Sequence, residues 1–185
     1  MRIIGGKARG RRVKTFRGRA LRPTAARVKE ALFDILPHDL SGRRVLDLFA
    51  GSGNLSLEAL SRGAAEAVLV DASRNAARVM RENLRRLGFE EKASVWTTAV
   101  VPSVRALARQ GRKFDLIFLD PPYEKGIVGS AMRALGEADL LEPHGTVVVE
   151  RSVRETIDPR YGKLELYDER RYGTTVLSFF GNKPS

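Results

Sequence analysis

The stretch that decides the fold is Val45-Leu46-Asp47-Leu48-Phe49-Ala50-Gly51-Ser52-Gly53-Asn54. An apolar run that meets two closely spaced glycines predicts a buried strand followed by a tight loop, and the apolar spacing that follows predicts a helix. The two glycines let the backbone pass close to a bound ligand. The longer glycine pattern that binds a pyrophosphate is absent, which disfavours a nicotinamide-dependent oxidoreductase.

Strands and helices alternate along the rest of the chain. The patterns predict further strands at 67–70, 93–98, 114–119 and 145–150, helices at 25–36, 73–87, 101–110 and 127–138, and a closing hairpin from 163–171 and 174–180. Strands joined by helices require right-handed crossovers. The chain is therefore predicted to form an α/β fold, with a mostly parallel sheet covered on both faces and an antiparallel C-terminal hairpin.

Three acidic residues follow or end predicted strands: Asp47, Asp71 and Asp120. In open sheets of this kind, ligands bind beyond the carboxyl ends of the strands, so the three acids are expected in one cleft. Asp47 suits a cationic ammonium group, and Asp71, 18 positions after Gly53, suits the two hydroxyls of a ribose. This combination predicts a site for S-adenosylmethionine.

The tetrapeptide Asp120-Pro121-Pro122-Tyr123 leaves the tip of the strand at 114–119. The Asp120 carboxylate and the Pro121 carbonyl can each accept an N–H from an exocyclic amine of a nucleobase, and so stabilise the charge that develops on that nitrogen. Pro122 stiffens the loop. Tyr123 is placed to stack on an unpaired base, a contact worth roughly 1–3 kcal/mol. The same tetrapeptide can also be a simple turn that closes a strand.

Composition bounds the class of protein. The 185 residues, 43% hydrophobic and 30% charged, suit one soluble domain spanning 1–185, expected to be monomeric and cytoplasmic. No apolar stretch is long enough for a membrane span, and there is no signal-type leader. Cysteine is absent, and His38 and His144 have no ligand spacing, so no metal site is expected.

The net charge of +11 is concentrated at the start of the chain. Residues 1–22 carry nine basic side chains and no acidic one, which leaves +2 for the rest. Such a block indicates contact with nucleic-acid phosphates, although a solubilising tail has the same composition. The intervening apolar residues and glycines predict a short β-hairpin in this arm. The candidate RNA-binding residues are Arg2, Lys7, Arg9, Arg11, Arg12, Lys14, Arg22 and Thr24, with Thr24 also expected to cap the helix at 25–36. Five arginines of the helix at 73–87, namely Arg74, Arg78, Arg81, Arg85 and Arg86, are interpreted as a solvated face, with contact to RNA as the secondary alternative.

Several segments are familiar as a set. They are Arg2-Ile3-Ile4-Gly5-Gly6, Arg22-Pro23-Thr24, Glu30-Ala31-Leu32-Phe33, residues 46–53, Leu57-Glu58-Ala59-Leu60-Ser61-Arg62-Gly63-Ala64 and Asp120-Pro121-Pro122-Tyr123. Over nearly the whole chain they resemble the bacterial family of 16S ribosomal RNA guanine-N2 methyltransferases. The resemblance implies a class I methyltransferase fold of Rossmann-like type with a seven-stranded sheet, S-adenosylmethionine as methyl donor, and an assembled or assembling 30S particle as substrate.

The resemblance also assigns residues. The cofactor-binding prediction comprises Asp47, Phe49, Gly51, Ser52, Gly53, Asp71, Ala72 and Ala99, and the base-clamp prediction comprises Asp120, Pro121, Pro122 and Tyr123. Many relatives have Glu where this chain has Asp71. The segment Thr98-Ala99-Val100 lacks the Asp or Asn often found near the adenine ring, so backbone groups are expected to read adenine. Asn54 stands where a small apolar residue is frequent.

Two other readings remain open. The clamp alone equally suits methylation of adenine N6 or cytosine N4 in DNA or RNA, although no separate target-recognition domain is present. In a different class, the chain could be a non-catalytic ribosome-assembly factor that binds RNA through its basic arm.

Overall fold

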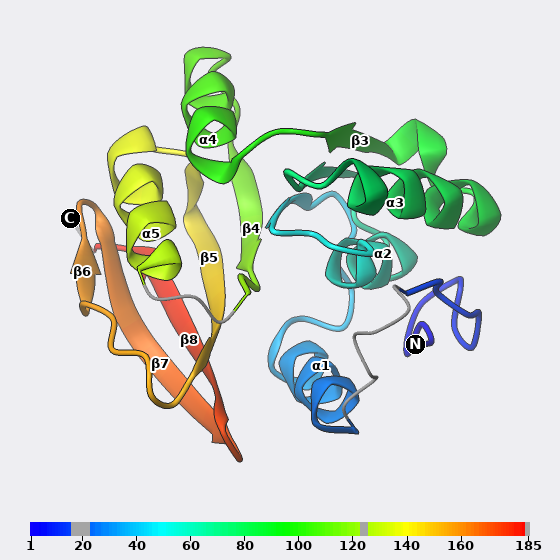
Figure 1. Ribbon diagram of the computed structural model, residues 1–185, viewed down its shortest axis with the longest axis horizontal. Helices are drawn as coiled ribbons and strands as arrows, with labels where there is room; N and C mark the ends of the chain where they lie inside the picture. Colours follow the sequence, from blue (N-terminus) through cyan, green and yellow to red (C-terminus); the bar gives the residue numbers. More distant parts are fainter. Residues whose placement is uncertain (16–22, 123–125, 184–185) are drawn as a thin grey trace.

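The computed structural model describes residues 1–15, 23–122 and 126–183, and Tyr123 and Arg22 lie outside these ranges. The predicted alternation of strands and helices is present (Figure 1). The elements are α1 (Pro23–Ile35), β1 (Arg44–Leu48), α2 (Asn54–Ser61), β2 (Glu66–Val70), α3 (Arg74–Leu87), the short helix η1 (Glu90–Lys92), β3 (Ala93–Trp96), α4 (Val100–Arg109), β4 (Phe114–Leu119), α5 (Ile127–Ala138), β5 (Leu141–Ser152), β6 (Arg160–Tyr161), β7 (Leu164–Tyr172) and β8 (Thr175–Asn182).

The strands form one sheet in the order β3-β2-β1-β4-β5-β8-β7-β6. The first five strands of the chain pair in parallel, and β8 joins β5 in antiparallel orientation as half of the predicted hairpin with β7. The described residues contain eight strands where the resemblance implies seven, because the two-residue β6 pairs with the outer edge of β7. The strand order reverses at β1, which has β2 on one side and β4 on the other, and ligands bind at such a switch point.

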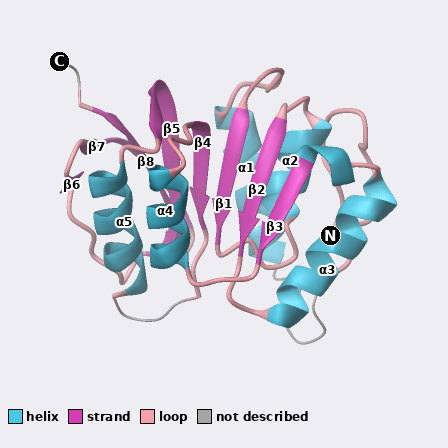
Figure 2. Ribbon diagram, turned by 90° about the horizontal axis from the view of Figure 1, so that it is seen from above, coloured by secondary structure: helices cyan, strands magenta, loops and turns pink. Residues whose placement is uncertain are grey.

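Helices cover both faces of the sheet, as Figure 2 shows for α4 and α5 in front of the strands and for α1 and α2 behind them. Each face has its own apolar core. Val45 packs with residues of α1, α2 and α3, whereas Leu46 and Leu48 pack with residues of α4 and α5. Successive side chains of β1 thus point to opposite faces, as the pleat requires. No helix in the described ranges has the length and apolar character needed to cross a membrane.

The boundaries differ from the predictions in a few places. β5 begins at Leu141 rather than 145, because Leu141 still pairs with Phe114 before a register shift in the ladder. β3 ends at Trp96. Helix α1 begins at Pro23, so Thr24 is its second residue and the prediction that Thr24 caps this helix is wrong. Proline is favoured at the first helical position, where its missing N–H costs no hydrogen bond.

Residues 1–15, called the N-terminal segment below, lie against α2 and α3 (Figure 1). The predicted hairpin is reduced to a single antiparallel bridge between Arg2 and Arg12. Ile3, Ala8 and Val13 are buried in the core shared with α1, α2 and α3. This part of the predicted arm is therefore docked on the protein rather than free of it.

Gly6 explains why the segment can approach α2 so closely. The N–H of Lys7 donates to the carbonyl of Ser61 at 2.8 Å, at the last residue of α2. A Cβ on Gly6 would stand 1.8 Å from that carbonyl oxygen, and Gly6 has a φ of +72°. The Ser61 hydroxyl accepts from the N–H of Ala8 at 2.9 Å and donates to the carbonyl of Gly5 at 2.6 Å.

A buried ion pair completes this junction. The Glu58 carboxylate, on α2, accepts from the N–H groups of Ile4 and Gly5 at 2.9 and 2.8 Å. It also pairs with Lys29 of α1 at 2.9 Å and with Arg62 at 3.1 Å. Burial lowers the pKa of Lys29, and the Glu58 charge opposes that effect. A buried charge needs such partners, so four donors on one carboxylate join the N-terminal segment to α1 and α2.

Candidate active site

The ends of three strands are aligned at the carboxyl edge of the sheet. Leu48 of β1 pairs with Val70 of β2 on one side and with Leu119 of β4 on the other. Asp71 and Asp120 directly follow Val70 and Leu119, and both are half-buried. Since neighbouring strands lie roughly 4.8 Å apart, the two acids flank the end of β1 at a separation of about 10 Å between their backbones.

Asp47 lies deeper, on the α2 side of β1. Its side chain is 1% exposed, and its carboxylate accepts from the hydroxyl of Ser56 at 2.8 Å and from the N–H of Ser56 at 3.3 Å. Burial raises the pKa of Asp47 to about 7, and the charges of Asp120 and Asp71 add to the shift. Asp120 and Asp71 are therefore both close enough to act electrostatically on Asp47. In this geometry Asp47 also secures the first turn of α2.

The glycine loop, residues 49–53, has an unusual backbone. Phe49, Gly51 and Gly53 have φ values of +67°, +57° and +79°. A positive φ is costly for an aromatic residue and marks a conformation that the surrounding structure imposes. The N–H of Ala50 donates to the carbonyl of Val70 at 2.9 Å, which ties the loop to the end of β2. A Cβ on Gly53 would lie 2.9 Å from the Leu69 side chain, so the loop also needs glycine there for close packing.

Asp71 is held in place by backbone donors. One carboxylate oxygen accepts from the N–H of Gly51 at 2.9 Å, and the other accepts from the N–H of Ser73 at 2.8 Å. The acid after β2 thus orients the glycine loop. Ala72 is exposed beside it, and Ala99 is exposed before α4, where no side chain caps the helix.

The base-clamp residues lie beyond β4. Asp120 is half-buried, Pro121 is buried and Pro122 is exposed. Phe118 packs with the α1, α2 and α3 core, so alternation along the chain directs Asp120 toward the same face as Asp47. Tyr123 lies outside the described residues.

Asn83 is a site residue that the sequence analysis missed. It is 1% exposed on α3, and its amide nitrogen donates to the carbonyl of Ser52 at 3.0 Å and to that of Lys14 at 2.9 Å. Its oxygen accepts from the N–H of Lys14 at 2.9 Å. One buried amide therefore joins the glycine loop to the N-terminal segment. The available signal was a polar residue at an apolar position of an amphipathic helix.

Asn54 also has a clear role in the structure. Its side-chain oxygen accepts from Lys29 at 2.9 Å, and Lys29 donates in addition to the carbonyl of Arg2 at 3.1 Å. The residue after the glycine loop therefore contributes to the polar network that docks the N-terminal segment. An apolar side chain at this position would leave Lys29 with one acceptor fewer.

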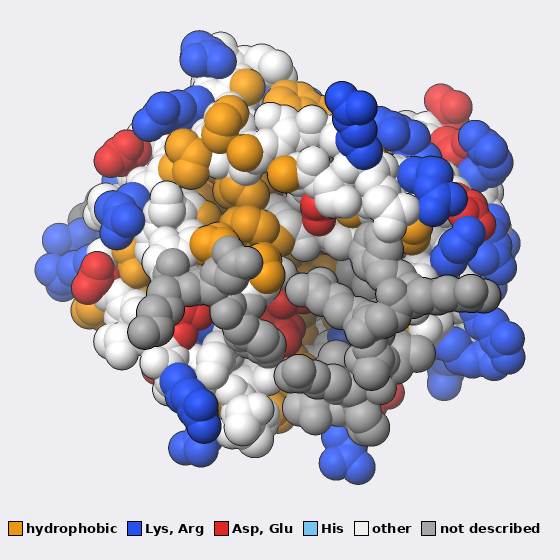
Figure 3. All heavy atoms as spheres, viewed as in Figure 1, with side chains coloured by type: hydrophobic (Ala, Val, Ile, Leu, Met, Phe, Trp, Pro, Cys, Tyr) orange, Lys and Arg blue, Asp and Glu red, His pale blue; other side chains and the backbone are white. Residues whose placement is uncertain are grey.

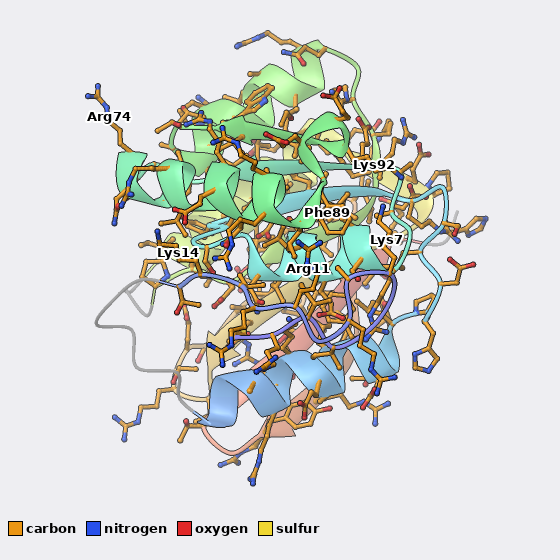
Figure 4. The ribbon with its side chains drawn as sticks, turned by 90° about the vertical axis from the view of Figure 1, so that its right-hand side faces the viewer. Lys7, Arg11, Lys14, Arg74, Phe89 and Lys92 are labelled. Carbon is orange, nitrogen blue, oxygen red and sulfur yellow. The ribbon has the colours of Figure 1, made fainter. Side chains whose placement is uncertain are left out.

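The predicted RNA-binding residues of the N-terminal segment are exposed, and Figure 4 shows Lys7, Arg11 and Lys14 beneath α3. They are Arg2, Lys7, Arg9, Arg11, Arg12 and Lys14. Three of them also hold the segment in place: Lys7 lies over the ring of Phe89 at 4.8 Å, Arg11 donates to the carbonyl of Leu87 at 3.4 Å, and Lys14 pairs with Glu82 at 2.6 Å. The side chain of Thr24 is not described.

Comparison with known proteins shows similarity over almost the whole chain. A family model described as conserved hypothetical protein 95 matches residues 1–181. The chain is 34% identical over 180 residues to ribosomal RNA small subunit methyltransferase D of Escherichia coli strain K12, covering 97% of this chain and 89% of that protein. A solved structure described as the methyltransferase candidate yhhF from Escherichia coli matches with a TM-score of 0.84 and 31% identity, covering 100% and 99% of the two chains.

A SAM-dependent methyltransferase from Agrobacterium tumefaciens has a TM-score of 0.65 and 20% identity, covering 93% of this chain and 66% of that chain. This more distant likeness concerns the fold. The predicted class I, Rossmann-like methyltransferase fold is confirmed.

Proposed function

Because the chain belongs to the family described as conserved hypothetical protein 95, and is similar over almost its whole length to ribosomal RNA small subunit methyltransferase D, we propose that it methylates ribosomal RNA with S-adenosylmethionine. The observation that carries this proposal is the alignment of Asp71 and Asp120 on either side of the glycine loop, at the switch point of the sheet. An open α/β sheet binds its ligands there.

The residues at this edge fit S-adenosylmethionine. Gly51 and Gly53 both have positive φ, and a Cβ on Gly53 would lie 2.9 Å from the Leu69 side chain, so the tight loop that we propose to hold the cofactor depends on glycine. Burial is the main cause of the raised pKa of Asp47, and the negative charges of Asp120 and Asp71 add to it; acidic groups gathered in this way favour a cationic ligand. Asp71, whose carboxylate is held by the N–H groups of Gly51 and Ser73, is the proposed acceptor for the ribose hydroxyls. The start of α4 after Ala99 has no side-chain cap, and its backbone N–H groups are the proposed donors to the adenine ring. When bound, the cofactor supplies a methyl group that is already activated as a sulfonium.

In this proposal, Asp120 and Pro121 bind and orient the amine that accepts the methyl group. The carboxylate and the carbonyl hold the two N–H groups of an amine, which turns the nitrogen lone pair toward the methyl group. The nitrogen gains a methyl group and loses one proton, which Asp120 accepts. Pro121 and Pro122 fix the loop before the base arrives. Tyr123 completes the proposed clamp by stacking on the base.

The proposed target is the N2 amine of one guanine in 16S ribosomal RNA, presented by the 30S subunit or an assembly intermediate. Support comes from the similarity to ribosomal RNA small subunit methyltransferase D and from the exposed basic side chains of the N-terminal segment. The proposed monomer approaches this RNA with the exposed residues Arg2, Lys7, Arg9, Arg11, Arg12 and Lys14, joined by Arg22 and Thr24.

The test is a transfer assay with tritiated-methyl S-adenosylmethionine and 30S subunits from cells that lack this modification, followed by digestion of the RNA to nucleosides. The label is expected in N2-methylguanosine. Asp120→Ala should abolish transfer while leaving binding of S-adenosylhomocysteine intact, because Asp120 acts on the acceptor. The matched control is Asp34→Ala, which removes an exposed carboxylate of α1 and should retain transfer.

The outcomes separate the candidate functions. Label in N6-methyladenosine or N4-methylcytidine would assign the clamp to another base. Binding to 30S subunits without transfer to any RNA would favour the non-catalytic assembly factor. Full transfer by the Asp120→Ala variant would refute the clamp.

A further inference from the structure

Four arginines of α3 form a row on its exposed side: Arg74, Arg78, Arg81 and Arg85, called the arginine stripe below. Their spacing of three or four residues places them on one face of the helix, over roughly 16 Å of its length. Arg78, Arg81 and Arg85 line an open hollow of about 450 Å³, together with Glu82. From the sequence, these residues are interpreted as a solvated face, with contact to RNA as the secondary alternative.

The stripe and the N-terminal segment form one surface. Lys14 pairs with Glu82, and Arg11 donates to the carbonyls of Arg86 and Leu87 at the end of α3. Figure 4 shows the segment running along the helix, with Lys14, Arg11 and Lys7 in sequence beneath it and Arg74 at the far end. Figure 3 shows Lys and Arg side chains, in blue, gathered on the right-hand side of the molecule, where Figure 1 shows α3 and the N-terminal segment.

The charge of the chain is concentrated on this surface. Residues 1–15 and α3 together carry eleven basic side chains and one acidic one, a net +10, while the whole chain has +11. The acid, Glu82, is matched by Lys14 at 2.6 Å. On a docked segment, these charges keep fixed positions next to those of α3. Concentrated positive charge of this kind is the electrostatic footprint of a nucleic-acid site.

We infer that the arginine stripe is a binding surface for the phosphate backbone of the RNA substrate, continuous with the N-terminal segment and leading to the cleft. This inference rests on the proposed function. The stripe starts at Arg74, three residues after Asp71, so RNA bound along it reaches the edge where the cofactor is proposed to bind. Arginine suits phosphate because its planar group donates two parallel hydrogen bonds.

The surface fits RNA better than it fits a protein partner. Protein interfaces have a buried centre enriched in aromatic and apolar side chains. The large hydrophobic side chains exposed in the described residues are Ile35 and Tyr167, and neither is on α3 or in the N-terminal segment. Phosphate contacts position a nucleic acid without reading its bases, so the stripe sets affinity and orientation while the clamp selects the base.

The experiment compares two variants of equal charge. The stripe variant replaces Arg74, Arg78, Arg81 and Arg85 with Gln, and the control variant replaces four exposed arginines elsewhere with Gln, namely Arg105, Arg109, Arg133 and Arg154. Glutamine has nearly the helix propensity of arginine, and Arg154 lies in an exposed turn, so both variants should keep their thermal midpoints. Equilibrium binding is measured to protein-free 16S RNA and to 30S subunits over a range of salt concentrations.

The stripe variant is expected to bind both RNA forms about tenfold or more weakly at 0.1 M salt. The plot of log K against log salt concentration should become shallower, with a slope smaller in magnitude by about 3, because each of the four lost phosphate contacts removes roughly 0.7–0.9 from the magnitude of the slope. The control variant should keep the slope of the unmodified protein. Binding of S-adenosylhomocysteine should be unchanged in both variants.

The results distinguish this inference from the proposed function. A stripe variant with the same salt slope as the control overturns the inference, even if the protein methylates RNA. Weakened binding to 30S subunits with unchanged binding to protein-free RNA also overturns it, because the partner of the stripe would then be a ribosomal protein. A stripe-dependent slope in a protein that transfers no methyl group supports the surface and refutes the proposed function.

Discussion

Replacing Asn83 with Ala is the most direct perturbation of the link between the glycine loop and the N-terminal segment. Asn83 makes three hydrogen bonds of 2.9–3.0 Å, one to the carbonyl of Ser52 and two to the backbone of Lys14. Each such bond contributes a net of roughly 0.5–1.5 kcal/mol. Because the side chain is 1% exposed, water cannot take over these contacts without local opening.

The Asn83→Ala variant should therefore lose about 2–4 kcal/mol of unfolding free energy. For a chain of this size, a loss of 2 kcal/mol lowers the thermal midpoint by roughly 4–8 °C. The Ser52 carbonyl would lose its fixed partner, so the loop would have to be ordered again when ligand binds. If that ordering costs about 1 kcal/mol, S-adenosylhomocysteine should bind about fivefold more weakly.

The assays are urea unfolding, titration calorimetry with S-adenosylhomocysteine, and amide hydrogen exchange of residues 13–15 and 51–54. The matched control is Asn75→Ala, on the same helix but exposed, where the asparagine accepts only from Arg78. This control should change stability by less than about 0.5 kcal/mol. Equal stability and equal ligand affinity in the two variants would refute the reasoning that Asn83 orders the loop.

Two further predictions follow from the same region. Burial raises the pKa of Asp47 to about 7, so the folded state holds a proton there that the unfolded state releases near pH 4; stability from this group is present at low pH and falls as the pH rises through 7. The free energy of unfolding, measured with urea, should rise for Asp47→Asn relative to the unmodified protein as the pH increases from 4.5 to 8. Parallel plots of unfolding free energy against pH for the two proteins would contradict this. Gly6→Ala should destabilise the protein more than Gly10→Ala. Both positions have positive φ, which costs an alanine about 1–2 kcal/mol at either position. A Cβ has open space at Gly10, whereas at Gly6 it would also collide with the carbonyl of Ser61. Urea unfolding and protease cleavage of the N-terminal segment measure this difference, and equal losses would show that the segment does not need the close approach to Ser61.

The sequence was sufficient for the fold because its signals are local. The strand and glycine loop at residues 45–53, the alternation that follows and the acids after β2 and β4 each depend on short-range spacing. Parallel pairing then forces the ends of β1, β2 and β4 to the same edge. The convergence of Asp47, Asp71 and Asp120 on that edge could therefore be predicted before any contact was known, and the electrostatic coupling of Asp47 to both other acids agrees with it.

The docking of the N-terminal segment could not be predicted in the same way. Its basic residues indicate exposure to solvent and contact with nucleic acid. Its attachment to the protein depends instead on contacts with residues more than 50 positions away in the sequence, such as Gly5 with Glu58 and Lys14 with Asn83. No periodicity encodes such pairs. Glu58 and Lys29 would each have been assigned to the surface by residue type, and only the fold shows that they neutralise each other.

The docked segment changes how the basic charge can act. On a free arm, positive charges attract RNA but impose no direction on it. Here Asn83 ties Lys14 to the glycine loop, and Glu58 ties Ile4 and Gly5 to α2, the helix that begins directly after that loop. Hydrogen bonds therefore join the N-terminal segment to the loop where the cofactor is proposed to bind. Under the proposed function, phosphates held on this surface would be positioned relative to the proposed base clamp, which is what methylation of a single base requires.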